Sequence, residues 1–419
     1  MSCVLAYPPD LTRYVVANWP AATPLTVPPR VLDDALAAAF QASLTSEEAR
    51  PTRFRLLLTP ASALPESGEA NKGVLRLMFD HARPLLPDEL RRLAPSVPFE
   101  TALIGAEHHA KDDALRIWGI AHSGPAWLAP TWGGRSVVPT WTHDPIIHVT
   151  GPGQLAVRSA GKLVGALERG ALVDAVMDVF DSKWLPALFT REREEVRAEH
   201  ERLSASRGAS TSVESALVGR IAQHMLRRII QLVRGGQHGG LILVVDSALD
   251  GAAAGLRLKY RIEQDEPSHR YRTILFRLLE AVASKSNKPS IGWSDFVADG
   301  STELAALEKE VFEWSRTLAN LAAIDGAVVL DKRFGVVGFG AEVSNELAAP
   351  LRVWHALDTE GAERRPESIE VVGTRHRAAY RFVNDYPNGL AIVISHDGNV
   401  SFVANRGGDV VFWEQSIRP

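Results

Sequence analysis

The chain has 419 residues, enough for two or three domains, and 46% of its residues are hydrophobic while 23% are charged. The formal net charge of −4 argues against general nucleic-acid binding, and the single cysteine, Cys3, excludes a disulfide framework and a cysteine metal site. No apolar run reaches the roughly 18 residues of a membrane span and the N-terminus lacks a signal-peptide pattern, so we expect a cytoplasmic protein with no membrane partner.

The N-terminal part of the sequence predicts one helix followed by many short strands. Residues 1–60 are rich in proline, which favours extended chain, and the apolar spacing predicts a helix at residues 31–44. From Arg53 to Gly170, short apolar runs alternate with turn residues, a pattern typical of a β-rich or α+β domain. These runs are residues 54–58, 114–120, 126–128, 146–150, 154–158 and 162–166.

Tryptophans and histidines are concentrated in this region, and each group allows two interpretations. The tryptophans could line a ligand pocket, but large aromatic side chains more often form the core. The histidines could bind a metal or haem, but their spacings match no compact ligand motif, which favours surface or hydrogen-bonded core positions. The residues are Trp118, Trp127, Trp132 and Trp141, with His108, His109, His122, His143 and His148.

A helical pattern at residues 172–203 contains a dense run of mixed charge at residues 191–202. Mixed charge at helical spacing predicts a solvated helix with i,i+4 ion pairs, here a connector. The small and polar residues 204–212 are the predicted linker. The predicted division is an α+β domain at residues 1–180, a charged helical connector and linker at residues 181–211, and a second domain at residues 212–419.

The second domain shows helices and strands in alternation. Helices are predicted from Ser212 or Ser215 to Gly235, around residues 271–284 and at residues 304–321, where apolar residues form the most regular stripe in the chain. Strands are predicted at residues 240–245, 327–330, 335–339, 391–395 and 400–403, the last four as two hairpins. These elements predict an α/β or α+β fold with a central mixed β-sheet flanked by helices.

Residues 369–379 predict a strand, a turn and the start of a helix, and from residue 371 they read V-V-G-T-R-H-R-A-A. Unpaired backbone N–H groups and the helix dipole attract an anion to such a start, with Thr374 as the expected N-cap. Arg375 and Arg377 make a polyphosphate the natural ligand, because guanidinium groups bind phosphate oxygens in pairs. The alternative is an ordinary capped helix with solvated arginines.

Asp325, Gly326 and Ala327 form a second motif where a predicted buried helix meets a strand. The two small residues let a base or sugar approach the backbone closely. A carboxylate there can hold Mg²⁺ or Mn²⁺ and help to deprotonate a hydroxyl. Together with a phosphate-binding turn, these residue types suit phosphoryl or nucleotidyl transfer. Alone, Asp325 is better explained as a turn residue at a helix end.

A second D-G-A tripeptide occurs at Asp250–Ala252 and has a different context. It runs into Ala253, Ala254 and Gly255, whereas the copy at Asp325 runs into a β-branched strand. We therefore interpret the copy at Asp250 as a turn.

Taken together, the motifs resemble the signature of the diadenylate cyclase (DAC) domain family. The order D-G-A then G-T-R-H-R-A-A, the strand context and Ser395 at the end of the next strand agree, and the resemblance covers residues 212–414. It implies conversion of two ATP into cyclic di-3′,5′-AMP and two pyrophosphates by two ATP-loaded domains placed face to face. Self-association as a homodimer or higher oligomer is therefore expected.

The resemblance also implies roles for individual residues. Asp325 would bind metal and activate the 3′-hydroxyl, with Gly326 and Ala327 beside the nucleoside. The triphosphate would be held by Gly373, Thr374, Arg375, His376 and Arg377, with Ser395 as a further phosphate contact. The implied catalytic residues are Asp325, Arg375, His376 and Arg377. The implied metal ligands are Asp325, His376 and Asp397, with Mg²⁺ or Mn²⁺ as the cofactor.

The N-terminal domain loosely resembles the soluble sensor domains that precede some bacterial cyclase domains, which implies regulation by an unknown small-molecule or protein input. No helix-hairpin-helix region is recognised, so DNA is not an expected partner. His396 and Asp397 stand where the family often has two glutamates. The alternatives are a catalytically altered or inactive nucleotide-binding sensor, a cyclase with another cyclic dinucleotide product, or a scaffold that recruits partners through residues 191–202.

Overall fold

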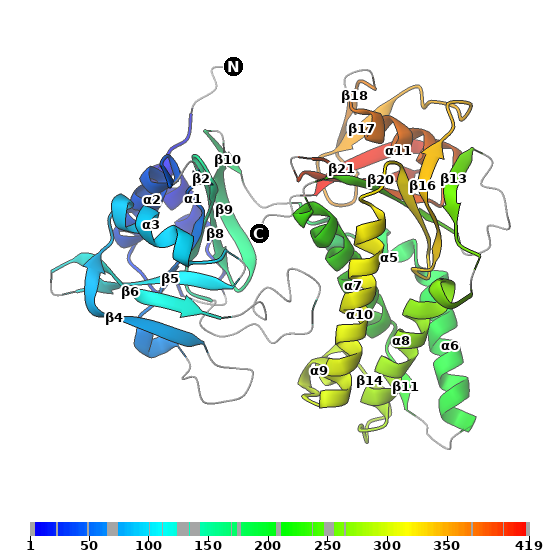
Figure 1. Ribbon diagram of the computed structural model, residues 1–419, viewed down its shortest axis with the longest axis horizontal. Helices are drawn as coiled ribbons and strands as arrows, with labels where there is room; N and C mark the ends of the chain where they lie inside the picture. The colour runs from blue at the N-terminus through cyan, green and yellow to red at the C-terminus, as the bar shows by residue number, and fades with distance from the viewer. Residues whose placement is uncertain are drawn as a thin grey trace. The chain divides into compact units, whose positions relative to one another are not determined.

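The computed structural model describes residues 5–21, 24–47, 50–64, 74–99, 101–110, 112–123, 134, 143–168, 170–173, 177–206, 211–236, 238–246, 255–263, 265–369, 372–396 and 398–415. Among these residues, no helix combines the length and apolar character needed to cross a membrane. The chain forms two compact units, one made mainly by residues 1–176 and the other mainly by residues 177–418 (Figure 1).

The first unit combines three α-helices with a mixed sheet in its described residues. The helices are α1 (Pro8–Ala17), α2 (Pro29–Ser43) and α3 (Pro87–Leu93). The strands are β1 (Ser46–Glu47), β2 (Arg50–Pro51), β3 (Phe54–Leu58), β4 (Leu75–Pro84), β5 (Ala102–His109), β6 (Ala114–His122), β7 (Ile146–Gly151), β8 (Gln154–Ser159), β9 (Lys162–Glu168) and β10 (Ala171–Val173). The main sheet has the order β10-β9-β8-β7-β3-β5-β6-β4, in which β3 and β5 are parallel.

The core of the first unit lies between this sheet and the helices α1 and α2. Leu11 of α1, Leu36 of α2 and Leu56 of β3 are all fully buried in one apolar cluster. Proline occupies the first turn of both helices, where its missing N–H costs no hydrogen bond. The N-terminal α+β domain expected from the sequence is therefore present as a packed unit.

The second unit contains a larger mixed sheet and most of the helices. The helices are α5 (Trp184–Ala187), α6 (Thr190–Ser206), α7 (Ser215–Gly235), α8 (Asp265–Ala283), α9 (Trp293–Ala298), α10 (Thr302–Leu321) and α11 (Thr374–Asp385). The strands are β11 (Ser212–Val213), β12 (Gly240–Val245), β13 (Leu256–Arg261), β14 (Ser290–Ile291), β15 (Ala327–Asp331), β16 (Val336–Val343), β17 (Val353–Ala356), β18 (Arg364–Glu367), β19 (Leu390–Ile394), β20 (Val400–Arg406) and β21 (Asp409–Gln415). The main sheet has the order β13-β16-β15-β12-β19-β20-β21-β17-β18.

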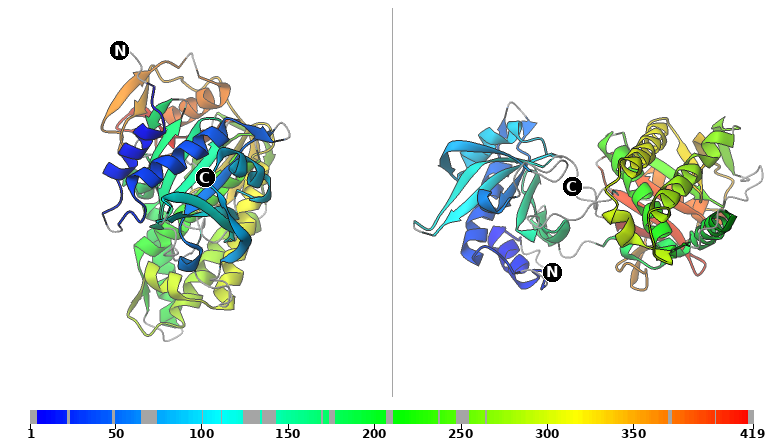
Figure 2. Two further views of the ribbon diagram at one scale, coloured as in Figure 1. Left: turned by 90° about the vertical axis from the view of Figure 1, so that its left-hand side faces the viewer. Right: turned by 90° about the horizontal axis from the view of Figure 1, so that it is seen from below.

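The two faces of this sheet are covered by different helices. Successive side chains of a strand point to opposite faces, and in β12 Leu241 and Leu243 face α11 while Ile242 and Val244 face the other side. On that other side lie α7, α8 and α10, which Figures 1 and 2 show gathered as one helical layer. The sheet is thus buried on both faces, which explains the continuous apolar run of β12.

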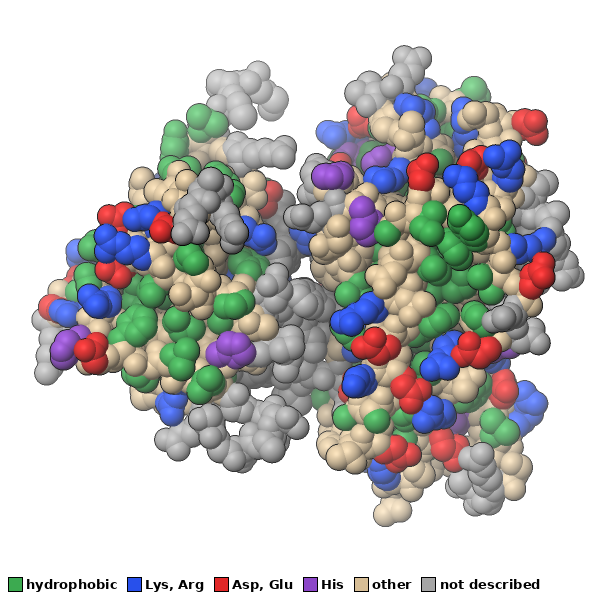
Figure 3. All heavy atoms as spheres, viewed as in Figure 1, with side chains coloured by type: hydrophobic (Ala, Val, Ile, Leu, Met, Phe, Trp, Pro, Cys, Tyr) green, Lys and Arg blue, Asp and Glu red, His purple; other side chains and the backbone are tan. Residues whose placement is uncertain are grey.

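The charged helix α6 packs within the second unit, which corrects the prediction of a solvated connector. It has the expected surface ion pair between Arg191 and Glu195 (3.1 Å), but Val196 and His200 are buried. Glu195 also pairs with Arg333 in the β15–β16 turn at 2.5 Å. Acidic and basic side chains are interspersed over the visible face of the helical layer (Figure 3). The division between the units falls at residues 176 and 177, before the predicted linker at residues 204–212.

Most elements expected from periodicity are present. The predicted helices correspond to α2, α7, α8 and α10, and the two predicted hairpins are the antiparallel pairs β15–β16 and β19–β20. β4 and β13 are absent from the prediction because these outer strands mix charged and apolar residues and bury few side chains. The expected run at residues 126–128 lies outside the described residues.

Candidate active site

Three strand ends meet at one edge of the main sheet in the second unit. β12 and β15 are parallel, with Leu241 opposite Ala327, while β19 is antiparallel to β12, with Ile394 opposite Gly240. The residues just before β12, just before β15 and just after β19 therefore lie near one another. They are Gly239, Asp325 with Gly326, and Ser395.

The helix α11 begins beside this edge and packs on β12, β19 and β20. Gly373 is its N-cap and Thr374 its first helical residue, so the expected N-cap at Thr374 is wrong by one position. The strand expected at residues 369–372 is also not found at its described ends, Ile369 and Val372. The backbone N–H of Arg377 donates to the Gly373 carbonyl. The three preceding N–H groups of the helix have no intrahelical acceptor, as at any helix start.

The helix start and the sheet edge enclose a cleft of about 580 Å³, within the usual range for small-molecule sites. Its polar lining residues are Asp325, Glu342, Thr374, Arg375, His376, Ser395 and His396, and the Glu342 carboxylate is paired with Arg257 and Lys259. Its apolar lining residues are Leu241, Ala327, Ala341, Val343, Ala378 and Val393, and Gly326 and Gly373 complete the motif residues. The structure thus brings the two sequence motifs together in one cleft that suits an organic anion.

Asp325 and Gly326 shape the sheet side of the cleft. Asp325 is exposed and makes no ion pair or hydrogen bond with any residue in the described part of the chain. Gly326 has φ +113°, and a Cβ there would lie 2.6 Å from the carbonyl carbon of Gly340. Only glycine adopts this positive φ without strain and leaves room for the neighbouring backbone. Asp325 therefore presents a free carboxylate on a backbone whose path is fixed by close packing of β15 on β16.

Arg375 lies against the loop before β12. Its Nη2 donates to the carbonyl of His238 at 3.1 Å. Gly239 has φ +63°, and a Cβ there would lie 2.6 Å from Arg375 Nη1. The guanidinium can therefore occupy this position in the cleft only because Gly239 has no side chain. Since α11 has no acidic residue in its first turn, an anion is the natural partner of this cationic helix start.

His376 is half-buried, with its Nε2 3.3 Å from Oγ of Ser401. Burial lowers the pKa of His376 below its ordinary value, against the opposing effect of the Glu414 carboxylate. The imidazole is therefore neutral at neutral pH and can offer a ring nitrogen to a metal ion. Ser401 on β20 orients the ring.

Of the other predicted site residues, some line the cleft and one does not. Ser395 and His396 line the cleft, and the Ser395 hydroxyl also accepts from the backbone N–H of Asn399 at 2.9 Å. Arg377 does not line the cleft, because its Nη1 donates to the Val372 carbonyl at 2.6 Å and holds the chain that enters α11. Asp397 lies outside the described residues.

The expected metal site is placed only in part. No group of three or more His, Cys, Asp and Glu residues able to hold a metal occurs within the residues that the structure describes. Of the expected ligands Asp325, His376 and Asp397, the first two line the cleft. A carboxylate without a partner among the described residues and a neutral imidazole in the same cleft are ligand types that fit Mg²⁺ or Mn²⁺.

Several residues that line or support the cleft were not singled out from the sequence as site residues. Gly239 and Ser401 each position a motif residue, and Leu241, Ala378 and Val393 form the apolar wall. Gly239 could have been found as a glycine directly before a buried strand, where close approach or a positive φ is common. Ser401 has no signal, because its contact with His376 depends on the pairing of β19 with β20.

The aromatic and histidine residues of the first unit have ordinary structural roles where they are described. The Trp118 indole is buried and donates to the Thr59 carbonyl at 2.9 Å, which fits the core interpretation. His108 lies 2.8 Å from an Asp113 carboxylate oxygen, and the buried His148 packs edge-on against Phe99. Trp127, Trp132 and Trp141 lie outside the described residues.

Comparison with known proteins identifies one part of the chain. No curated protein matches the chain. A crystal structure of the hypothetical membrane spanning protein from Bacillus cereus is similar at 17% identity over 56% of this chain and 96% of that chain, but the TM-score of 0.24 supports no inference about fold. Residues 23–122 match the family model described as the probable sensor domain DACNV, which bears out the expectation of a sensor-type domain in the N-terminal part.

Proposed function

We propose that the second unit is a diadenylate cyclase that uses Mg²⁺ or Mn²⁺ and is regulated by the sensor domain. The proposal rests chiefly on the single cleft that joins residues 325–327 to the start of α11. The match of residues 23–122 supports it, because the DACNV sensor domain is associated with diadenylate cyclases.

The two sides of the cleft suit the two ends of ATP. The adenosine would lie along Leu241, Ala327 and Val393, where small and apolar side chains leave room for a flat ring. The phosphates would lie at the start of α11, where free backbone N–H groups and Arg375 donate hydrogen bonds. Arg377 would act indirectly by holding the entry to the helix through Val372.

The reaction requires two nucleotides in opposed orientations. The 3′-oxygen of one ATP bonds to the α-phosphorus of the other, and the bond from that phosphorus to the pyrophosphate oxygen breaks. Two such steps give cyclic di-3′,5′-AMP, two pyrophosphates and two protons. In each step, Asp325 accepts a hydrogen bond from the 3′-hydroxyl and Arg375 stabilises the negative charge on the phosphate.

A divalent metal held by Asp325 and His376 would neutralise phosphate charge and lower the pKa of the 3′-hydroxyl. The neutral state of His376 and the free carboxylate of Asp325 support this assignment. Because each cleft would hold only one ATP, the active species would be a homodimer or a higher oligomer.

Purified full-length protein incubated with ATP and either Mg²⁺ or Mn²⁺ provides the test, with the product masses measured. We expect cyclic di-AMP and pyrophosphate. A second candidate function is a nucleotide-binding sensor without turnover, which His396 in the cleft favours because it replaces an expected acidic residue. ATP binding with no cyclic dinucleotide under either metal would reject the cyclase and support this sensor. Supplying all four nucleoside triphosphates tests for another product.

A further inference from the structure

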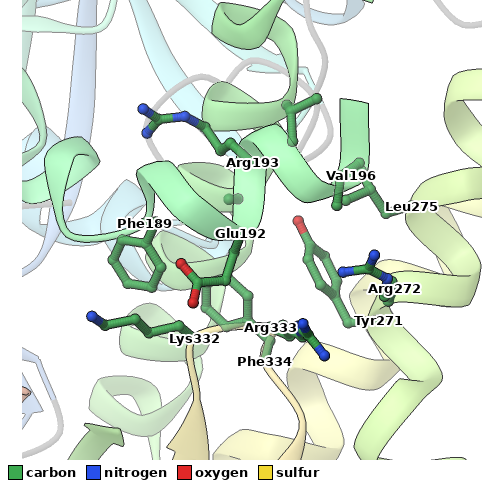
Figure 4. A pocket seen from close by; sticks show the side chains of 12 residues that line it. Phe189, Glu192, Arg193, Val196, Tyr271, Arg272, Leu275, Lys332, Arg333 and Phe334 are labelled. Atoms are coloured by element: carbon green, nitrogen blue, oxygen red, sulfur yellow. The ribbon is translucent and has the colours of Figure 1, made fainter. Parts of the chain in front are cut away.

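A second cavity lies in the helical layer, on the face of the sheet opposite the cleft. It has a volume of about 30 Å³ and is bounded by α6, α7, α8 and the β15–β16 turn (Figure 4). Its apolar walls include Phe189, Val196, Leu275 and Phe334. A cavity of this size has room for a water molecule or a small polar group.

Two buried polar side chains in this cavity lack a partner. Glu192 of α6 is 7% exposed and Tyr271 of α8 is 4% exposed. Neither Oε2 of Glu192 nor the hydroxyl of Tyr271 has a hydrogen-bond partner among the residues described. Burial of a carboxylate without a partner is strongly unfavourable, so such an oxygen marks the place of a ligand atom. In Figure 4 the Tyr271 hydroxyl is directed toward α6.

Three of the four basic side chains that line the cavity are bound to other carboxylates, and the fourth, Arg193, donates to the Pro186 carbonyl and the Thr190 hydroxyl. Lys332 pairs with Asp246 at 2.6 Å and Arg333 pairs with Glu195 at 2.5 Å. The third basic residue, Arg272, pairs with Glu199 at 2.5 Å. Figure 4 shows the Lys332 ammonium and the Arg193 guanidinium pointing away from the Glu192 carboxylate. Glu192 forms no ion pair within the described part of the chain, and the neighbouring Arg191 and Arg193 act on its carboxylate only over longer distances.

The aromatic rings of the cavity favour a cation. Phe189 and Phe334 are parallel with centroids 6.0 Å apart, and Tyr271 meets Phe334 at 5.0 Å. The electron-rich faces of such rings attract ammonium groups, most strongly where water is excluded. A smaller apolar hollow of about 20 Å³ adjoins the cavity and shares Phe189 and Phe334 with it. It provides room for a short hydrocarbon tail.

We propose that this cavity binds a small primary amine, whose ammonium group donates to Glu192 and Tyr271 and whose short apolar tail lies between Phe189 and α7. The bound amine connects α6 with α8 and with the turn that ends β15. It therefore stabilises the packing of α6 on the second unit. The other end of β15 begins at Ala327 in the cleft, so this site and the candidate active site share one strand.

Thermal unfolding of the full-length protein tests this proposal at constant ionic strength. Sodium chloride is replaced stepwise by ammonium, methylammonium or propylammonium chloride. We expect a saturable rise in the unfolding midpoint with at least one of these cations. A midpoint no higher than in sodium chloride would show that the cavity holds only water and would overturn the proposal.

Variants of the cavity residues test whether a rise in the unfolding midpoint comes from this cavity. Glu192→Gln removes the charge while keeping the shape and is expected to abolish the rise, whereas Glu194→Gln on the exposed side of α6 keeps it. Tyr271→Phe removes one hydrogen bond to the amine. It is therefore expected to raise about fivefold the amine concentration that gives half of the maximal rise in the midpoint. An undiminished effect in Glu192→Gln contradicts the proposal. If that variant does not fold, an unchanged half-effect concentration in Tyr271→Phe contradicts it. None of these readouts depends on cyclase activity.

Discussion

Arg375 depends on a residue that is distant in sequence. Its guanidinium lies over Gly239, and its Nη2 donates to the carbonyl of His238. A side chain at Gly239 would displace the guanidinium and also press on the backbone of Ser395. The position of the Arg375 guanidinium in the cleft is therefore set as much by the loop before β12 as by α11 itself.

Gly239→Ala is predicted to weaken ATP binding about tenfold, since one charge-assisted hydrogen bond to phosphate is lost. Isothermal titration of the purified protein measures this. Gly407→Ala is the matched control, because Gly407 has φ +66° with nothing within 4 Å of a Cβ, so it reports backbone strain alone. In an Arg375→Ala background, Gly239→Ala should add no further loss. Equal affinities in the two glycine variants would contradict the role assigned to Gly239.

His224 gives the second unit a dependence on pH. Burial, assisted by Arg228, Arg227 and Arg220, lowers the pKa of His224 from 6.5 to about 3. The folded pKa is the lower one, so stability is complete above about pH 6.5 and is lost as the pH falls toward 3. When the pH falls from 6.5 to 5.0, protonation of His224 in the unfolded state should lower the free energy of unfolding by about 2 kcal/mol.

Denaturant unfolding at these two pH values checks the assignment to His224. His224→Phe, which keeps a ring against Trp293, should lose about 2 kcal/mol less than the wild type on acidification. His269→Phe on the exposed face of α8 should follow the wild type. A His224→Phe protein with the wild-type pH dependence would show that another group titrates.

At the level of single residues, the sequence predicted which motif residues meet in the cleft better than how each side chain lies there. Asp325 and Arg375 are recognisable only through the two motifs together, because each residue alone has an ordinary explanation as a turn aspartate or a solvated helix-start arginine. Arg377 belongs to the same motif, yet its side chain turns to the Val372 carbonyl, and spacing along a helix cannot show this. Ser401 reaches His376 only through strand pairing.

Among the elements, α5 and α6 differ most from the sequence-based expectation. A polar helix with dense mixed charge resembles a solvated connector, but residues on α7, α8 and the β15–β16 turn provide partners for its buried side. Such partners lie far away in sequence, so composition alone could not reveal them. Strongly periodic helices such as α10 were predicted correctly because one apolar stripe determines both the helix and its buried face.

The segment that begins the second unit is anchored by Trp184 of α5. Its ring stacks on Trp413 of β21 with centroids 4.4 Å apart, and its indole N–H donates to the Thr359 carbonyl at 2.9 Å. Trp184→Ala should lower the free energy of unfolding of this unit by about 4 kcal/mol, because it leaves a cavity and an unpaired carbonyl. Denaturant titration measures the loss. Leu351→Ala, at a fully exposed side chain, should be neutral, and a comparable loss there would contradict the anchor.

At the scale of the whole molecule, the proposed reaction needs two chains. The rate of product formation per chain should rise with protein concentration until self-association is complete. Size-exclusion chromatography at the same concentrations should show the oligomer appearing in parallel. A rate per chain that is constant over a range in which the protein is monomeric would contradict the two-chain mechanism.

The central claim is that Asp325 and the start of α11 form one nucleotidyl-transfer site. The most direct measurement compares the mass of cyclic dinucleotide made from ATP and Mn²⁺ by the wild type, by Asp325→Asn and by Asp250→Asn, which alters the other D-G-A tripeptide. We predict at least a ~100-fold loss of product for Asp325→Asn and near wild-type product for Asp250→Asn. Wild-type product from Asp325→Asn, or loss of product only in Asp250→Asn, would contradict the account.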